Sequence, residues 1–163
     1  MKQTRIRFAL WTAVVLWMAL IFTLSAQPAA ESSELSGGLI RAVAGIVMPG
    51  FNGMDAAAQG DLIESFQHVA RKTAHVLAYM MLGILSMSAF LRYSLKMRTR
   101  AVSSLALCIV YAISDELHQL LIDGRSGQLS DVLIDSAGAL MGIGVAWFVF
   151  SVRTRRRNRL REY

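Results

Sequence analysis

Cysteine, proline and charge are all scarce in this chain. Cys108 is the only cysteine, so no intrachain disulfide can form, and its place inside an apolar run predicts a buried side chain without a chemical role. Only 17% of the 163 residues are charged, whereas 55% are hydrophobic. A chain of this size and composition is typical of a single membrane domain.

Acidic residues are missing from the three segments that carry most of the positive charge. Of the 17 Lys and Arg residues, three lie in residues 1–7, four in residues 92–100 and six in residues 153–161. Each segment flanks an apolar run. The distribution of the basic residues behind the net charge of +6 therefore indicates membrane topology. Nucleic-acid binding is excluded, because it would need a further folded module and the sequence has none.

Long uncharged runs, by contrast, are abundant, and a helix needs about 20 apolar residues to cross a bilayer. Residues 1–152 are therefore predicted to form one all-α membrane domain, a four-helix bundle, followed by a basic cytoplasmic tail at 153–163. Both termini and the 92–100 loop are expected in the cytoplasm, because Lys and Arg collect on that side. The first run is expected to stay as an anchor, since its apolar core exceeds the roughly 7–15 residues of a signal peptide. The predicted spans cover about 8–25, 73–91, 101–121 and 132–152.

Both prolines fall in the extracytoplasmic segment between the first two spans. Pro28 and the Gly37-Gly38 pair are predicted to break the chain, and Pro49-Gly50 to end the helical periodicity of residues 39–47. This short amphipathic helix could lie in the outer membrane interface or fold over the bundle as a lid.

Two helix starts are predicted from capping residues. Asp61 is expected to cap a helix that continues into the second span. Residues 123–128 have turn chemistry, and Ser130 or Asp131 is expected to cap the fourth helix after them.

Polar side chains interrupt three of the apolar runs near their outer ends. Charged groups are costly in a bilayer, so they mark a functional site by default. The polar side chains of the three runs lie about 18–28 Å above the inner ends of their helices. The three helices therefore bring these side chains to a similar depth in the membrane. We therefore predict an outward-facing polar pocket whose ligand-binding residues are Arg71, Lys72, His75, Tyr79, Asp115, Glu116, His118, Gln119, Arg125, Asp131 and Asp135.

Three- and four-residue spacings place these side chains on shared helix faces. The three faces are Lys72–His75–Tyr79, Tyr111–Asp115–His118–Gln119 and Asp131–Asp135–Gly138–Gly142. Glu116 lies about 100° from Asp115 and is expected to serve a neighbouring contact. Gly138 and Gly142 form a GxxxG pattern, which lets two helices approach closely.

The cationic residues favour a binding protein of the cell envelope. Arg71, Lys72 and Arg125 suit a phosphate or carboxylate, as in the headgroup of a membrane lipid or a lipid-linked cell-wall precursor. Arg125 could instead pair with Asp115 or Asp131 and close the bundle.

The sequence leaves other functions open. His75, Asp115, Glu116 and His118 are candidates for acid–base catalysis in an intramembrane enzyme. Asp115, His118 and His75 are candidate ligands for Zn²⁺ or Mn²⁺, but no HExxH or comparable pattern occurs, and no cofactor is expected. A proton relay or transport pathway and a purely structural polar cluster remain alternatives.

Four segments match a known family pattern in order and spacing, within about residues 66–145. They are Arg71-Lys72-Thr-Ala-His75-Val-Leu-Ala-Tyr79-Met-Met-Leu-Gly83, Ser114-Asp115-Glu116-Leu-His118-Gln119, Gly124-Arg125-Ser126-Gly127 and Asp131-Val-Leu-Ile-Asp135-Ser-Ala-Gly138. The chain thereby resembles the VanZ-like family, named for a protein associated with resistance to the glycopeptide teicoplanin. It departs from the family pattern at Asp135, where Asn is frequent, and at Asp123, where Pro is common.

The resemblance implies a small multi-pass protein of the bacterial cytoplasmic membrane. It also implies an effect on how glycopeptides reach cell-wall precursors, but it supplies no established reaction.

Overall fold

The computed structural model describes residues 1–27, 29–122 and 128–160 of the chain. These residues form five α-helices and one short 3-10 helix, with no strand among them, which confirms the predicted all-α class. The elements are α1 (Lys2–Ser25), α2 (Ala29–Val47), η1 (Phe51–Gly53), α3 (Ala56–Phe90), α4 (Met97–Gln119) and α5 (Leu129–Arg159).

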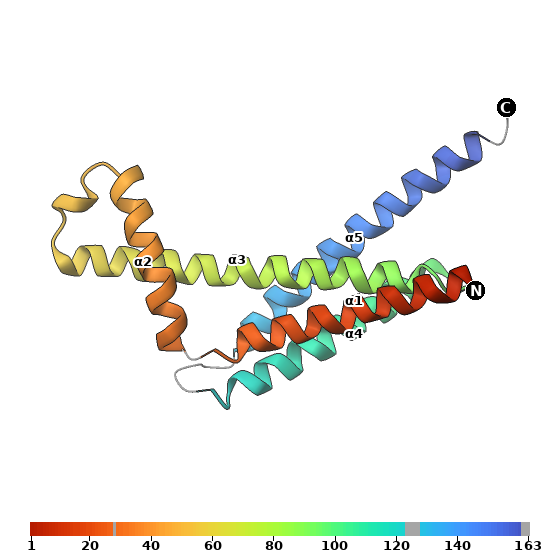
Figure 1. The fold of residues 1–163 in the computed structure, drawn as a ribbon, viewed down its shortest axis with the longest axis horizontal. Helices are drawn as coiled ribbons and strands as arrows, with labels where there is room; N and C mark the ends of the chain where they lie inside the picture. Colours follow the sequence, from red (N-terminus) through yellow and green to blue (C-terminus); the bar gives the residue numbers. More distant parts are fainter. Residues whose placement is uncertain (28, 123–127, 161–163) are drawn as a thin grey trace.

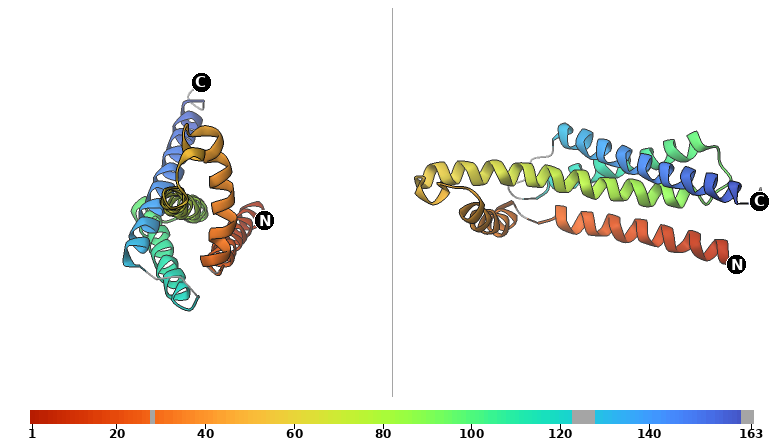
Figure 2. Two further views of the ribbon diagram at one scale, coloured as in Figure 1. Left: turned by 90° about the vertical axis from the view of Figure 1, so that its left-hand side faces the viewer. Right: turned by 90° about the horizontal axis from the view of Figure 1, so that it is seen from above.

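Helix α3 is the centre of the molecule and contacts each of the other four α-helices. Figure 1 shows α1 and α4 running beside it, α2 crossing its N-terminal part, and α5 diverging from it towards the C-terminus. Seen from above in Figure 2, α3 and α5 lie side by side, with α1 on the opposite side of α3. The 35 residues of α3 span about 52 Å, more than a hydrocarbon core of about 30 Å, so α3 is longer than a crossing requires.

Helices α1, α3, α4 and α5 are each long and apolar enough to cross a membrane. Their outer faces carry large apolar side chains, for example Val110 at 67% exposure and Phe148 at 68%. An apolar outer surface along four long helices suits contact with lipid rather than water.

Each predicted span lies almost wholly within its helix, but the helices extend further into the charged flanks. The tail predicted from residue 153 is not separate, because α5 continues to Arg159. Arginine is a good helix former, and positive side chains are favourable at a helix C-terminus.

The prediction that Asp61 caps the second spanning helix is wrong. Helix α3 begins earlier, at Ala56, and Asp55 is its N-cap, with a carboxylate oxygen that accepts a hydrogen bond from the Ala58 N–H at 2.7 Å. The alanines after Asp55 favour helix, so Asp61 falls inside α3.

The prediction for the start of the fourth spanning helix is also wrong. Gln128 is the N-cap of α5, and it makes no side-chain capping hydrogen bond. The Ser130 hydroxyl instead bonds the side chains of Gln128 and Asp131, at 3.2 and 3.4 Å. Both predicted caps therefore lie within the first turn of α5.

Gly37 and Gly38 do not break the chain, because α2 passes through both of them. A Cβ added at Gly37 would lie 2.7 Å from Nε2 of Gln67, so the missing side chain lets α2 pack closely on α3. The predicted stop at Pro49-Gly50 is confirmed: α2 ends at Val47, and Gly50 has a φ of 89°. Pro28 lies outside the described residues. A small core holds α2 and η1 against α3, formed by Ala44, Phe51 and Ile63.

Glycines bring the backbones of α3 and α5 into direct contact. A Cβ added at Gly142 would overlap the carbonyl oxygen of Met80, and one at Gly138 would crowd the carbonyl oxygen of Val76. From the other side, a Cβ at Gly83 would overlap the backbone of α5. The close approach predicted from the GxxxG pattern is confirmed.

Side-chain hydrogen bonds fasten α1 to the other helices. The indole N–H of Trp17 donates to the Ala78 carbonyl oxygen of α3 at 2.9 Å. The Tyr111 hydroxyl of α4 donates to the carbonyl oxygen of Met18. Helix α1 is therefore held along its length by polar contacts as well as by apolar packing.

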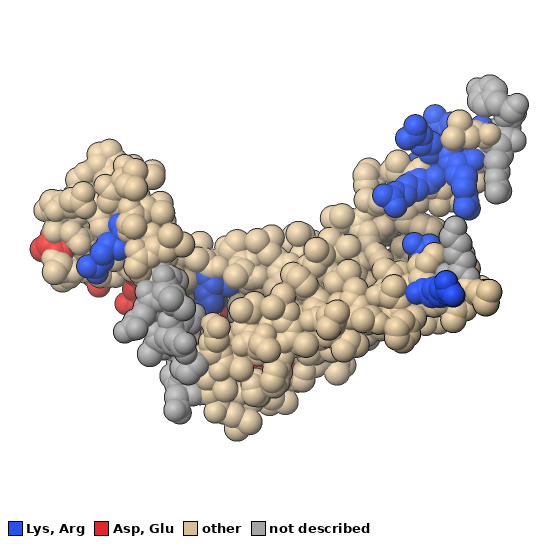
Figure 3. All heavy atoms as spheres, in the orientation of Figure 1, with Lys and Arg blue, Asp and Glu red and all other residues tan. Residues whose placement is uncertain are grey.

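The basic segments meet at one end of the molecule. The Arg7 guanidinium donates to the Arg92 carbonyl oxygen at 2.8 and 3.0 Å, and both termini lie at this end (Figure 1). Figure 3 shows Lys and Arg gathered there on the visible face, whereas the long middle of that face is almost free of charge.

We predict that Gly142→Ala destabilises the protein by about 1–3 kcal/mol, because the added methyl group must push α3 and α5 apart. The matched control is Gly144→Ala on the same helix, where an added Cβ meets nothing within 4 Å. Thermal unfolding in detergent should show a lower midpoint for Gly142→Ala and an unchanged or slightly higher midpoint for Gly144→Ala. Equal midpoints for the two variants would contradict this account of the crossing.

Candidate functional site

The polar faces of α3, α4 and α5 meet near the C-terminal end of α1, at Ser25. His75, Asp115 and Asp135 each offer a ligand atom, and these three atoms all lie within 4.8 Å of one another. Asp115 is 2% exposed and Asp135 is fully buried, whereas His75 is partly exposed. The expectation that three helices pool polar side chains at one level is confirmed for these residues.

His75 and Asp135 form the link between α3 and α5. The imidazole Nδ1 lies 3.3 Å from Oδ1 and 3.4 Å from Oδ2 of Asp135. Val76 follows His75 directly, and Gly138 lies one turn beyond Asp135, so the backbone contact between Val76 and Gly138 fixes this pair.

Asp115 is held by two neutral donors. Its Oδ2 accepts hydrogen bonds from the Ser25 hydroxyl at 2.9 Å and from the Gln119 amide at 3.3 Å. Its Oδ1 is buried and has no hydrogen-bond partner within the described ranges of the chain. The site predicted from the sequence does not include Ser25, because a single serine at the end of an apolar run has no spacing pattern that would indicate a role.

Three more predicted residues lie around this cluster. Lys72 forms an ion pair with Asp131 at 3.5 Å, with both side chains partly exposed. Tyr79 is fully buried, and no described residue forms a hydrogen bond with its hydroxyl.

Glu116 turns away from Asp115, as its position on α4 predicts. Its Oε2 accepts a hydrogen bond from the Gln128 N–H at 2.9 Å. The carboxylate therefore steadies the start of α5.

His118 does not join the cluster, which corrects the predicted metal-ligand set. Its ring stacks on Phe22 of α1 with centroids 4.2 Å apart, and its buried Nε2 has no hydrogen-bond partner in the part of the chain that the structure describes. Residues three apart on a helix differ by about 60° in direction, enough to aim Asp115 and His118 at different neighbours. Asp135 takes the place of His118 in the set that the structure brings together. Arg125 lies outside the described residues.

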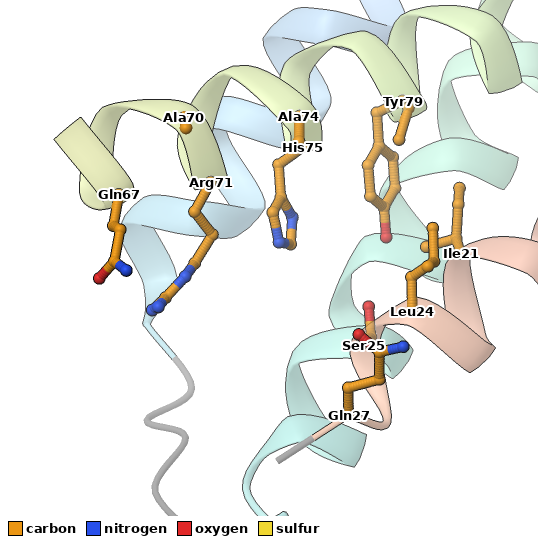
Figure 4. Close-up of a pocket in the computed structure, with 11 residues that line it drawn as sticks. Ile21, Leu24, Ser25, Gln27, Gln67, Ala70, Arg71, Ala74, His75 and Tyr79 are labelled. Atoms are coloured by element: carbon orange, nitrogen blue, oxygen red, sulfur yellow. The ribbon is translucent and has the colours of Figure 1, made fainter. Parts of the chain in front are cut away.

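A cavity of about 330 Å³ lies beside the cluster, between α1 and α3. Figure 4 shows Arg71 and His75 pointing from α3 into it, and the Tyr79 hydroxyl directed towards the end of α1. Arg71 is exposed and forms no hydrogen bond or ion pair with the described part of the chain. The lining residues are Ile21, Leu24, Ser25, Gln27, Gln67, Ala70, Arg71, Ala74, His75, Ala78 and Tyr79.

No residue of the 39–47 segment lines this cavity. Apart from Ala44 and Ile40, which pack in the small core with α3, its large apolar side chains are exposed, and this favours a position in the membrane interface over a lid. The exposed side chains are Leu39, Val43, Ile46 and Val47.

A second cavity, of about 410 Å³, continues between α1 and α3 towards the middle of the bundle. It shares Ile21, Leu24, Ala74 and Ala78 with the first, and its other lining residues are Trp17, Leu20, Leu77, Met80, Met81 and Ile84. We call it the apolar groove. A cavity that contains a cation and shares lining residues with an apolar groove can hold an amphiphile with a charged head.

Comparison with known proteins places the chain in a family. The family model described as VanZ/LLP1 matches residues 10–150, a range that includes the whole His75–Asp115–Asp135 cluster and both cavities. No curated protein and no solved structure matches the chain. With four helices able to cross a bilayer, this chain is a multi-pass membrane protein that belongs to the VanZ/LLP1 family.

Proposed function

We propose that this protein binds the anionic headgroup of a membrane lipid, such as that of a lipid-linked cell-wall precursor. One observation carries the proposal: the cavity that contains Arg71 and His75 shares its apolar wall with the groove between α1 and α3. A phosphate or carboxylate would lie in the cavity, and a hydrocarbon chain would lie along the groove.

The charge in the cavity suits an anion. Arg71 presents a guanidinium that no described residue neutralises, and a guanidinium binds phosphate or carboxylate with two parallel hydrogen bonds. Lys72 is already paired with Asp131, so Arg71 is, among the described residues of the predicted site, the cation available to a ligand. His75 from α3 and Ser25 from α1 both line the cavity and can orient the anion.

The depth of the two cavities suits a lipid as well. Counted from Phe90, Arg71 lies about 28 Å along α3, which is close to the limit of a hydrocarbon core of about 30 Å. The groove residues Ala74 to Ile84 lie below that limit. A lipid could therefore keep its headgroup at the membrane surface and its chain within the bilayer.

We place both termini and the α3–α4 connection in the cytoplasm, and the cavity on the outer side of the cytoplasmic membrane. The basic segments gather at one end of the molecule, and such clusters mark the cytoplasmic side. The cavity lies towards the opposite end, beside the outer end of α1.

A reaction on the bound headgroup is the second candidate function. The observation in its favour is that His75 lines the cavity and also contacts the buried carboxylate of Asp135, an arrangement able to move a proton. Binding and catalysis differ in outcome, because only catalysis changes the lipid.

The orientation predicts opposite labelling of two single-cysteine variants. In a Cys108→Ala background, Gly53→Cys should react with a membrane-impermeant maleimide in intact cells or spheroplasts. Ser94→Cys, in the connection after α3, should react only after the membrane is opened. Both positions are exposed in the structure, so labelling reports on the side of the membrane. The reverse pattern would place the cavity in the cytoplasm and exclude an outer-surface ligand.

Lipid retention should depend on Arg71 and on the groove. We expect protein purified in mild detergent with added phosphatidylglycerol and phosphatidylcholine to retain the anionic lipid in preference, as seen by native mass spectrometry. Arg71→Gln should reduce that preference about tenfold or more, since a hydrogen bond to a charged group contributes about 1.5–3 kcal/mol. Ala74→Phe should reduce retention of both lipids, because the ring fills the junction of the two cavities.

Two matched variants control for general effects. Arg41→Gln removes an exposed charge from α2, and Val110→Phe enlarges a lipid-facing side chain on α4. Neither should change retention, and equal losses in Arg71→Gln and Arg41→Gln would refute the site. If the recovered lipid has lost its headgroup, and if this loss requires His75, the result would favour the catalytic function.

A link to glycopeptide resistance follows if the bound lipid is a cell-wall precursor. Expression in a teicoplanin-susceptible bacterium should then raise the inhibitory concentration of teicoplanin several-fold, because the antibiotic and the protein meet at the same precursor. Arg71→Gln should cancel the increase at equal expression, and Arg41→Gln should preserve it. An unchanged inhibitory concentration with the unmodified protein would remove this part of the proposal.

A further inference from the structure

We propose that His75, Asp115 and Asp135 form a binding site for a divalent transition-metal ion. The site does not depend on the identity of the lipid, and it uses a different ligand set from the one predicted by sequence. The proposal starts from the distances, since one ligand atom from each residue lies within 4.8 Å of the other two.

The described residues do not balance the buried charges of the cluster. Among them, two carboxylates that are at most 2% exposed face at most one positive charge, that of a protonated His75. Arg71 forms no ion pair with the described residues, and Lys72 is paired with Asp131 instead. A buried carboxylate without a counter-charge is strongly unfavourable, so a cation at this position would stabilise the fold.

The unpaired atoms point to a ligand rather than to a closed network. Oδ1 of Asp115 and the Tyr79 hydroxyl are both buried and have no hydrogen-bond partner among the described residues. Oδ1 of Asp135 makes no hydrogen bond there either and meets only Nδ1 of His75, at 3.3 Å. Buried polar atoms are nearly always satisfied, so two such atoms beside a carboxylate with a single long contact call for a bound group.

The surroundings of Asp115 resemble the outer shell of a metal site. Ser25 and Gln119 both donate to its Oδ2, which fixes the carboxylate and leaves Oδ1 free. Metal-binding carboxylates are held by hydrogen bonds of this kind. Ser25 therefore positions a ligand and does not bind the ion itself.

The spacing of His75 and Asp135 also fits a metal. Ligand atoms in a tetrahedral zinc site, bonded at about 2.0–2.1 Å, are about 3.3–3.4 Å apart. The Nδ1 of His75 lies 3.3 and 3.4 Å from the two oxygens of Asp135, longer than most hydrogen bonds between such groups. An ion would replace the proton that the two residues otherwise share.

The donor set selects the kind of ion. One imidazole and two carboxylates suit Zn²⁺ or Mn²⁺ better than Ca²⁺ or Mg²⁺, which favour oxygen ligands alone. Because His75 and Tyr79 line the cavity, a remaining coordination position would face the headgroup.

Metal binding can be tested on the full-length protein without any assay of activity. The chain is purified in detergent, stripped with a chelator, and titrated with Zn²⁺ or Mn²⁺, with bound metal and thermal unfolding followed together. We expect stoichiometric binding and a higher unfolding midpoint that chelator reverses. Asp115→Asn keeps the shape and the contacts with Ser25 and Gln119, and should weaken binding about 100-fold or more.

Three further variants make the result decisive. Asp135→Asn should lose the metal like Asp115→Asn, and both should stay folded without metal, because each removes an unbalanced charge. Asp131→Asn and His118→Asn should bind metal as the unmodified protein does. The proposal is overturned if the protein neither retains metal nor unfolds later with it, if Asp115→Asn and Asp135→Asn bind normally, or if His118→Asn loses the ion.

Discussion

The contact between the backbones of α3 and α5 is the constraint on which the rest of the structure depends. Only glycine allows it, since a side chain at Gly142 or Gly138 would occupy the position of a carbonyl group on α3. The contact sets His75 beside Asp135, because each lies within a turn of the crossing. Close helix packing of this kind replaces the hydrophobic effect, which provides little driving force between helices surrounded by lipid.

Near this crossing, buried polar groups need hydrogen-bond partners that water does not supply. Asp115 and Asp135 are too deep to be hydrated freely, and their helices supply few counter-charges. Helix α1 contributes the hydroxyl of Ser25, which completes the surroundings of Asp115 from a span without an acidic residue. The cluster is therefore a product of four helices, although its acid and base groups come from three.

The order of the side chains along α3 determines which kind of ligand the site can bind. The helix is longer than a bilayer is thick, and it carries α2 and η1 on its N-terminal part through the core of Ala44, Phe51 and Ile63. Along α3, Arg71 comes first, His75 lies about one turn further on, and most of the apolar groove follows. A gradient from cation to imidazole to hydrocarbon on one helix matches the polarity of a lipid, and this links the proposed ligand to the fold.

Sequence alone determined the features that follow from composition and period: the all-α class, four long apolar helices, the end of α2 before Gly50, and the family. Helical spacing also indicated which side chains share a face, but it could not give the direction in which that face points. It therefore grouped His118 with Asp115, whereas in the structure His118 stacks on Phe22. It could not locate Ser25 or identify Asp55 as a cap, because a lone polar residue has no period. The tertiary structure decided these points, since the distance between residues 25 and 115, or 75 and 135, depends on how closely separate helices pack and on their rotation against one another.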